Sequence, residues 1–365
     1  MTGDLENVES RLRSQPGQSN TDRALGTLDA RLRMWEQERG YSGIAVIARG
    51  GVREFEGCYG LANRSEGIPV STETRFGLAS VTKMFTAVAV ARFVRSGLVS
   101  FDTAVRDILP AGRCPTTLRP DVTVHHLLSH TSGIADYFEE GDDYAALWTD
   151  RPNYRILCPA DMLSLFANLA PHGRPGQRFQ YSNAGFVLLG LIVEEIAGVP
   201  YPDAVAESVL EPAGLTSTGF FALDEVQTHL AIGYLPPREA GGPWRSNIYS
   251  IPSMGGPDGG AFATAADLDR FLRAYADGTL LGEQLRAAML TPRCVVRDGV
   301  EVGYGVFLYG GGRFGHTGED PGCEVMVQHL PEFDTSVIAL CNMNGFAHEI
   351  GDLMVELVLK GFSSR

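Results

Sequence analysis

The stretch SVTKMFTAVAVARFVR, residues 80–95, carries the strongest helix signal in the chain. The apolar side chains that surround its helical projection on nearly every side are Met84, Phe85, Val88, Val90, Phe93 and Val94. A helix that is apolar all round lies inside a fold and not on its surface. We therefore expect residues 80–95 to form a central helix, with the rest of the chain packed around it.

The first turn of this expected helix holds a serine and a lysine three residues apart, Ser80 and Lys83. Residues at that spacing share a helix face, so the hydroxyl and the amine should lie side by side. A serine hydroxyl is a weak nucleophile until a base takes its proton, and burial makes an ammonium lose its proton more readily. Of the 30 basic residues only Lys83 and Lys360 are lysines, and an arginine could not serve as this base because its pKa exceeds ~12. The pair is a candidate nucleophile and base; a buried salt bridge of Lys83 is the alternative.

Strand signals lie toward the two ends of the chain, and helix signals fill the middle. Near the N-terminus we expect a helix over residues 21–39 and then strands over 43–48 and 52–61. In the middle the expected helices cover 122–129, 159–169, 184–197 and 201–210, and a further helix opens at residue 264. The C-terminal strands are expected over 303–309, 324–330 and 335–341, before a last helix over 346–359.

This order predicts a discontinuous α/β unit that carries an inserted all-α unit. The predicted division is a loose tail at residues 1–20, an α/β domain from 21–105 plus 246–365, and a helical lobe over 106–245. Sites often lie in the cleft between two such units.

Composition and charge narrow the classes of function. The chain of 365 residues has a formal net charge of −14, so it lacks the basic footprint of a nucleic-acid-binding protein and would be repelled by anionic membranes. No apolar run reaches the ~18 residues of a membrane helix, and the first twenty residues lack the apolar core of a signal peptide. We therefore expect a cytoplasmic protein that acts on a small molecule.

The six cysteines show no C-x-x-C pair. In a cytosolic chain of this size they are expected to be free core thiols, neither a disulfide framework nor a zinc site.

Two further triplets could add chemistry. Tyr181-Ser182-Asn183 precedes the apolar helix expected over 184–197; Ser and Asn are favoured N-caps, but a phenol beside a Ser–Lys pair could also carry a proton to a leaving group. His316-Thr317-Gly318 stands between two C-terminal strands in GRFGHTGEDPG. This pattern is typical either of an ordinary turn or of a glycine-rich strand edge that a substrate can approach closely.

Ser-x-x-Lys, Tyr-x-Asn and His-Thr-Gly follow one another at residues 80, 181 and 316. This order resembles the serine β-lactamase and penicillin-binding-protein superfamily, specifically its class C-like and family VIII esterase branch. Thr74-Arg75-Phe76 and the Leu-Leu-Ser-His-Thr-Ser-Gly run at 127–133 also match, and the resemblance spans roughly residues 40–345.

The resemblance implies an α+β fold (an α/β sandwich), in which helices flank an antiparallel sheet and an all-α lobe is inserted, as in β-lactamases and transpeptidases. It implies that Ser80 is the nucleophile and that Lys83 and Tyr181 together act as general base and proton shuttle. It places Asn183, His316, Thr317, Gly318 and Glu319 in substrate binding, with the backbone N–H groups of Ser80 and Glu319 as the oxyanion hole. The resemblance implies no cofactor and no metal.

Two departures from the family pattern bear on the substrate. His316 stands where β-lactamases and carboxypeptidases usually carry a lysine that binds the substrate carboxylate. Glu319 stands where the family prefers a small residue, and Asp320 follows it. A carboxylate ~4 Å from an anionic substrate costs about 4 kcal/mol at an effective dielectric of ~20. We therefore expect a neutral or cationic ester or amide, and the acidic, aromatic stretch at residues 137–144 either lines the same mouth or is a solvated loop.

The leading interpretation is a serine hydrolase, an esterase or amidase, that works through a Ser80 acyl-enzyme. The alternatives are a β-lactamase or D-Ala-D-Ala carboxypeptidase, an acyltransferase on the same fold, and a catalytically silent binding or sensor relative.

Two other constellations are set aside. His130 and Asp136 suggest a Ser-His-Asp triad, but no G-x-S-x-G elbow occurs, and we expect His130 to hold the turn after residues 122–129. His126 and His130 have the spacing of zinc ligands on a helix, but the glutamate of H-E-x-x-H is missing.

Overall fold

The structure is a computed structural model that describes residues 20–139, 144–148, 151–239 and 241–361. The expected loose tail at 1–20 lies outside the described residues except for Asn20, which begins helix α2 (Asn20–Arg39).

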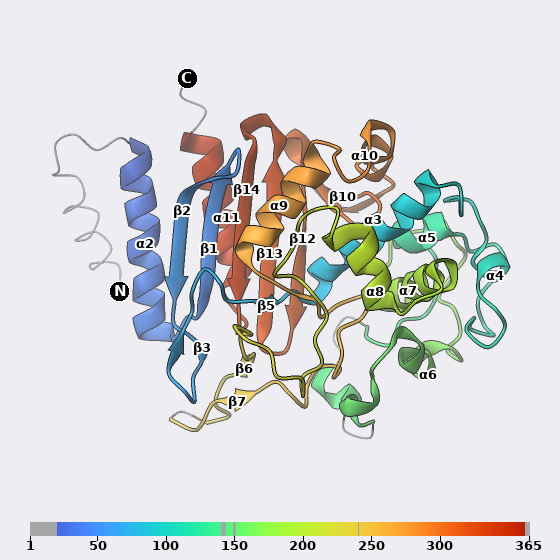
Figure 1. Ribbon diagram of the computed structural model, residues 1–365, viewed down its shortest axis with the longest axis horizontal. Helices are drawn as coiled ribbons and strands as arrows, with labels where there is room; N and C mark the ends of the chain where they lie inside the picture. The colour runs from blue at the N-terminus through green and yellow to red at the C-terminus, as the bar shows by residue number, and fades with distance from the viewer. Residues whose placement is uncertain (1–19, 140–143, 149–150, 240, 362–365) are drawn as a thin grey trace.

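An eight-stranded sheet forms the body of the molecule (Figure 1), and every neighbouring pair in it is antiparallel. In spatial order the strands are β2 (Val52–Tyr59), β1 (Gly43–Arg49), β14 (Thr335–Cys341), β13 (Cys323–Leu330), β12 (Arg313–Asp320), β11 (Phe307–Tyr309), β10 (Val300–Val302) and β9 (Cys294–Arg297). The N-terminal hairpin therefore joins the C-terminal strands along the β1–β14 ladder. This arrangement confirms the predicted α+β fold with an antiparallel sheet flanked by helices.

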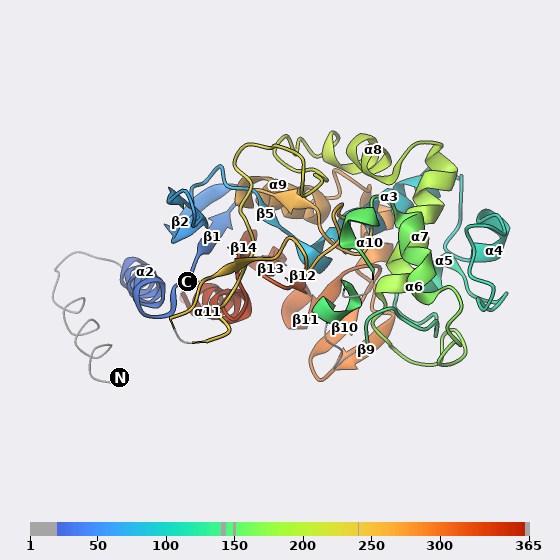
Figure 2. The ribbon, with the colours of Figure 1, turned by 90° about the horizontal axis from the view of Figure 1, so that it is seen from below.

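Both faces of the sheet are covered, which explains why β1 is apolar along its length. Alternate residues of a strand point to opposite faces. Ile44 and Val46 join the cluster that includes α9 (Ala265–Ala276), whereas Ala45 and Ile47 join the cluster with α2 and α11 (Ala347–Gly361). Figure 2 shows α9 on one side of the sheet and α11 with α2 on the other.

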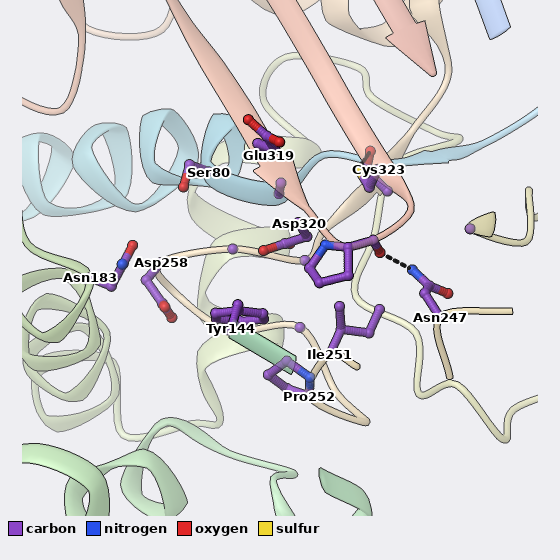
Figure 3. A pocket seen from close by; sticks show the side chains of 18 of the residues that line it. Ser80, Tyr144, Asn183, Asn247, Ile251, Pro252, Asp258, Glu319, Asp320 and Cys323 are labelled. Atoms are coloured by element: carbon purple, nitrogen blue, oxygen red, sulfur yellow. Dashed lines mark hydrogen bonds between the residues drawn. The ribbon is translucent and has the colours of Figure 1, made fainter. Parts of the chain in front are cut away.

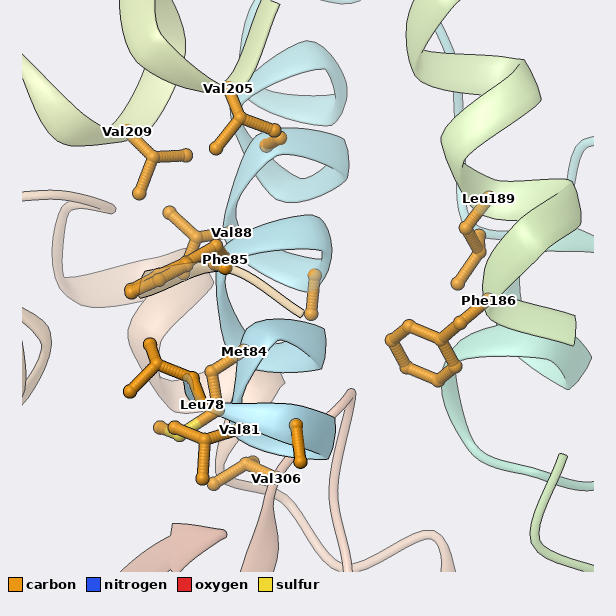
Figure 4. Packing of buried hydrophobic residues seen from close by; sticks show 14 of the residues in the cluster. Leu78, Val81, Met84, Phe85, Val88, Phe186, Leu189, Val205, Val209 and Val306 are labelled. Carbon is orange, nitrogen blue, oxygen red and sulfur yellow. The ribbon is translucent and has the colours of Figure 1, made fainter. Parts of the chain in front are cut away.

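Helix α3 (Thr82–Arg95) lies at the centre of the helical part of the molecule, next to the sheet. Its residues 82–91 are all buried. Its apolar side chains face α8 (Tyr201–Val205) and the turn after it on one side and α7 (Asn183–Ala197) on the other (Figure 4). Phe85 meets Phe271 edge-on, with ring centroids 4.7 Å apart. The predicted central helix is thus confirmed, although its first turn is a separate 3-10 segment, η1 (Ala79–Val81).

Short elements complete the fold. The remaining helices are α4 (Val105–Ile108), α5 (Val124–Leu128), α6 (Leu163–Phe166) and α10 (Glu283–Met289), and α8 continues as one π-turn, Ala206–Leu210. Three two-stranded sheets pair β3 (Leu61–Asn63) with β4 (Ile68–Pro69), β5 (Phe76–Gly77) with β8 (Phe262–Ala263), and β6 (Tyr234–Leu235) with β7 (Arg245–Ser246).

The prediction for the C-terminal strands was partly wrong. Residues 303–309 hold only the short strand β11, and β9, β10 and β12 were not expected. The His316-Thr317-Gly318 triplet lies inside β12 and not in a connection between strands. Glycines disfavour strands in general, but here they allow close packing: a Cβ at Gly315 would lie 2.0 Å from the carbonyl oxygen of Val327 on β13.

The cysteine prediction also needs correction. All six thiols are free, but only Cys323 and Cys341 are buried, and Cys158 is exposed. Cys158 lies at the start of a 3-10 turn, where its Sγ is 3.3 Å from Asp161 Oδ2. It is therefore a turn residue and not a core thiol.

Within the described residues no single helix has the length and apolarity needed to cross a bilayer. Only α7 combined with residues 201–210 passes that test, as a pair bent by 79°.

Candidate active site

Ser80 lies on η1, immediately before the buried helix α3. The residue before it, Ala79, has a φ of +43°, a left-handed conformation that costs an alanine strain. This sharp entry leaves Ser80 partly exposed at the wall of a cavity while the rest of the turn is buried.

Lys83 is completely buried beneath Ser80. Its Nζ donates to Ser80 Oγ at 3.0 Å, to Asn183 Oδ1 at 2.8 Å and to the backbone oxygen of Asp258. Among the described residues, no carboxylate forms a salt bridge with this amine. The alternative of a buried salt bridge is therefore wrong, and the amine contacts the serine hydroxyl directly.

The start of helix α7 holds the Tyr181-Ser182-Asn183 triplet in position. Ser182 caps this helix, with its Oγ accepting from the N–H of Gly185 at 2.9 Å. Asn183 is the first helical residue, and its backbone N–H donates to Asp136 Oδ2. The same carboxylate oxygen accepts from the N–H of Ala184 at 3.2 Å. Asp136 thus holds the backbone of the triplet, and burial raises the pKa of this carboxyl to about 6.

Tyr181 projects its ring over the lysine, with Lys83 Nζ 5.0 Å from the ring centroid. Its hydroxyl makes no hydrogen bond with any described residue, so the structure does not link it to Ser80 directly. The ring lines the cavity and lies 6.4 Å from the ring of His316.

His130 and Asp136 do not form a triad with Ser80. The Nδ1 of His130 accepts from the N–H of Ser182 at 3.0 Å, and the carboxylate of Asp136 accepts backbone N–H groups. His126 Nδ1 lies 2.9 Å from Thr123 Oγ1 in the capping box of α5, so it serves the helix cap. The sequence predicted that His130 holds the turn after residues 122–129; the structure adds that its ring binds the backbone of Ser182 in the Tyr181 segment.

The His316-Thr317-Gly318 triplet lies on strand β12, at the point where this strand passes Ser80. The pairing with β11 ends at Gly315, so residues 316–320 have a strand neighbour on the β13 side only. A Cβ at Gly318 would lie 2.9 Å from the backbone nitrogen of Ser80 and 2.4 Å from the oxygen of Leu78. The absence of a side chain at Gly318 therefore lets the strand approach the backbone of the nucleophile turn.

His316 is buried, and desolvation, with a smaller contribution from Lys83, lowers the pKa of its imidazole to about 3. The side chain is consequently neutral at pH 7. Its Nδ1 donates to the backbone oxygen of Thr317, and its ring packs on Phe307. This position offers no positive charge to a substrate carboxylate.

The two acidic residues that follow point in different directions (Figure 3). Glu319 is exposed, and its Oε1 lies 3.3 Å from Nδ2 of Asn344, close to the start of α11. Asp320 instead projects toward Asp258 and Tyr144. Both residues line the cavity, and the carboxylate of Asp320 is the one that points toward Asp258 and Tyr144.

One cavity of about 1530 Å³ includes most of the predicted site. Ser80, Tyr181, Asn183, His316, Thr317 and Glu319 line it, whereas Lys83 and Gly318 lie behind its wall. Of the acidic stretch at 137–144, residues Tyr137, Phe138, Glu139 and Tyr144 line the cavity, and 140–143 lie outside the described residues.

Sequence reasoning missed Asp258, whose backbone oxygen binds Lys83 and whose Oδ2 accepts from the Tyr137 hydroxyl. The one available signal was the glycine-rich run around it, GGPDGG at 255–260. A Cβ at Gly259 would lie 3.5 Å from the backbone of Ala79, at van der Waals distance, so this loop lies directly against the nucleophile turn.

Comparisons with known proteins find one family model and several similar sequences and structures. The family model described as Beta-lactamase matches residues 23–358. "Penicillin-binding protein 4*" of Bacillus subtilis (strain 168) is 26% identical over 324 residues, which cover 83% of this chain and 68% of that protein. "Esterase EstB" of Burkholderia gladioli is 36% identical over 186 residues, which cover 50% of this chain and 47% of that protein. The crystal structure of a penicillin binding protein from Bacillus halodurans superimposes with a TM-score of 0.83 and 37% identity, covering 91% of this chain and 99% of that one.

Proposed function

Because this chain belongs to the beta-lactamase family, we propose that it is a serine hydrolase that forms an acyl-enzyme at Ser80 from an ester or amide. The observation that carries the proposal is the 3.0 Å contact between Lys83 Nζ and Ser80 Oγ in a site where no described carboxylate pairs with the amine. Direct contact between a buried amine and a serine hydroxyl is the geometry that a lysine general base requires.

In the proposed acylation, Lys83 acts as the general base and takes the proton of Ser80 as Oγ attacks the substrate carbonyl. The carbonyl electron pair moves onto oxygen, which the N–H groups of Ser80 and Glu319 stabilise. The bond to the leaving group then breaks, and Tyr181 delivers to it the proton that Lys83 collected. Asn183 holds the amine through its Oδ1.

Deacylation repeats these steps with water as the nucleophile. Water loses its proton toward Tyr181 and Lys83, attacks the acyl carbon, and Ser80 Oγ leaves with a proton from Lys83. No step needs a cofactor or a metal ion.

The substrate is proposed to be a small molecule without a carboxylate beside the scissile bond. Neutral His316 cannot form the ion pair that such a carboxylate would need, and the acidic side chain of Asp320 faces the same cavity.

The test compares p-nitrophenyl butyrate hydrolysis by the natural chain, by Ser80→Ala and by Ser96→Ala. Ser96 is an exposed serine just after the other end of α3, so its replacement controls for a serine-to-alanine change on the same element. Loss of turnover in Ser80→Ala alone supports the proposal. Equal rates in all three proteins would contradict it.

Three alternatives predict different products. The similarity to penicillin-binding proteins supports a β-lactamase or D-Ala-D-Ala carboxypeptidase, which would turn over benzylpenicillin or a D-alanyl-D-alanine peptide as fast as the neutral ester. An acyltransferase would form a new ester when an alcohol is added. A silent binding relative would show a trapped acyl-enzyme by intact mass, or no acylation, and no released product.

A further inference from the structure

We infer that the cavity beside Ser80 contains a subsite for a protonated amine, in which the carboxylate of Asp320 receives an ammonium group of the substrate. This inference rests on the proposed function for the identity of the reacting serine, and it goes further by naming the charged group that the substrate carries.

The position of Asp320 follows from the geometry of β12. Side chains alternate along a strand, so His316, Gly318 and Asp320 share one face. Gly318 is the residue that contacts the nucleophile turn. At ~3.3 Å per residue, His316 and Asp320 lie roughly 7 Å along the strand from Gly318, in opposite directions. The serine therefore has a neutral imidazole on one side and a carboxyl group on the other.

The carboxyl group of Asp320 has no partner among the described residues. None of them donates a hydrogen bond to it, and no described arginine or lysine forms a salt bridge with it. The neighbouring Cys323 thiol donates instead to the backbone oxygen of Gly77 at 2.9 Å. Asp320 is partly buried and points into the cavity (Figure 3).

The charges that surround Asp320 are mostly of its own sign. Asp258 and Glu319 raise its pKa and Lys83 lowers it, while desolvation is the largest cause of an increase to about 7. Two carboxyl groups that share a poorly hydrated space repel each other when both are ionised, and a cation placed beside them relieves that repulsion. An ammonium group is thus the complementary ligand, and binding it should displace the proton that Asp320 holds near neutral pH.

An aromatic wall adds to the preference for a cation. Tyr144 lies on the same side of the cavity as Asp320 and Asp258 (Figure 3). A tyrosine face attracts an ammonium group within about 6 Å of its centroid. Arg178 and Arg297 also line the cavity, but neither forms a salt bridge with these two acids.

The experiment measures inhibition of p-nitrophenyl butyrate hydrolysis by benzylammonium and by its neutral counterpart benzyl alcohol, at pH 6 and pH 8. The ammonium compound should bind about 10- to 100-fold more tightly than the alcohol at pH 8, the range of a charge-assisted hydrogen bond. The preference should shrink at pH 6, where Asp320 is protonated. In Asp320→Asn the two compounds should inhibit alike at both pH values.

Asp224→Asn is the matched control, because it removes one negative charge from an exposed residue that does not line the cavity. It should keep the full preference for benzylammonium. The measured quantity is the ratio of the inhibition constants of the two compounds on the same protein. A lower fraction of folded Asp320→Asn protein affects both constants equally and does not change this ratio.

Equal inhibition by both compounds in the natural chain would overturn the inference, and so would an ammonium preference that survives Asp320→Asn. If no ester is turned over, the proposed function fails separately. The subsite is then tested by calorimetric titration of the natural chain with the same two compounds, with the same expected ratio.

Discussion

The imidazole ring of His130 stacks on the phenol ring of Tyr181, with centroids 4.5 Å apart and 23° between the planes. His130 is buried, has a φ of +56°, and accepts the N–H of Ser182 on Nδ1. It therefore fixes both the backbone and the ring of the Tyr181 segment without touching Ser80. We interpret it as a positioning residue for the proposed proton shuttle.

The first prediction removes this stack but keeps the hydrogen bond. Asn tolerates a left-handed φ, and its Oδ1 can replace Nδ1 as the acceptor. His130→Asn should lower kcat by about tenfold, since an aromatic pair contributes only ~0.5–1.5 kcal/mol, and KM should change little. The measurement is steady-state ester hydrolysis alongside thermal unfolding. A loss of 1,000-fold or more with an unchanged melting temperature would instead make His130 part of the chemistry.

The second prediction tests whether the residue at position 83 must be able to accept a proton. Lys83→Arg places a guanidinium that stays protonated where the proposed base must lose its proton. Turnover of p-nitrophenyl butyrate should fall by about 10²- to 10⁴-fold, the usual contribution of general base catalysis. Lys360→Arg changes the only other lysine, which is exposed near the end of α11, and should leave the rate as it was. An active Lys83→Arg protein would show that the amine is not the base.

The third prediction tests the contact between β12 and the nucleophile turn. In Gly318→Ala the new methyl group would lie 2.9 Å from the nitrogen of Ser80 and 2.4 Å from the oxygen of Leu78, both backbone atoms. The strand or the turn must shift, which should disturb the oxyanion site and reduce kcat/KM by at least about 100-fold. Gly310→Ala is the control, because a Cβ there meets nothing within 4 Å. Equal activity of the two variants would contradict the close approach.

The fourth prediction concerns the carboxylate that holds the start of α7. Asp136 accepts the N–H groups of Tyr137 at 2.7 Å and Phe138 at 3.2 Å on Oδ1, and those of Asn183 and Ala184 on Oδ2. In Asp136→Asn one oxygen becomes an NH2 group that faces two donors. The free energy of unfolding should fall by about 2–4 kcal/mol, and ester turnover should fall with it because Asn183 loses its backbone anchor. Chemical denaturation of both proteins measures the first effect, and an unchanged midpoint would show that Asp136 does not hold the triplet.

Much of this architecture was predictable from the sequence because strong patterns carry it. The apolar helix at 80–95, the β1–β2 hairpin and the final helix all have a periodicity that survives in the fold. The three triplets lie far apart in the chain, and their convergence followed from the family resemblance alone. The structure adds the contact that joins two of them, from Lys83 to Asn183.

The parts that were missed depend on tertiary contacts. The sequence placed the His316-Thr317-Gly318 triplet between two strands, as a turn or a glycine-rich edge, and not inside β12. Gly315 and Gly318 are needed there because neighbouring backbones come close. The direction of Glu319 and Asp320 could not be known without the register of β12, since a shift of one residue exchanges the two faces. Asp258 has no sequence pattern of its own, because it reaches Lys83 through a backbone oxygen.

The last prediction uses the pH dependence of stability to examine Asp320 without any substrate. Burial and neighbouring acids raise the pKa of Asp320 to about 7 in the folded protein, against ~3.9 in the unfolded chain. Between these values the folded state binds more protons than the unfolded state, so this group's contribution to stability is lost as the pH rises from about 4 to 7. Above pH 7 the ionised carboxylate destabilises the fold in full.

Asp320→Asn removes that destabilising charge. Its melting temperature should therefore exceed that of the natural chain at pH 8 and match it at pH 4, with the difference growing across the window between. Asp224→Asn should show no such growth, because that carboxyl group is exposed. Scanning calorimetry at pH 4, 6 and 8 measures all three proteins. A melting temperature of Asp320→Asn that falls below that of the natural chain at pH 8 would mean that the carboxylate is stabilised within the protein itself and does not await a cationic ligand.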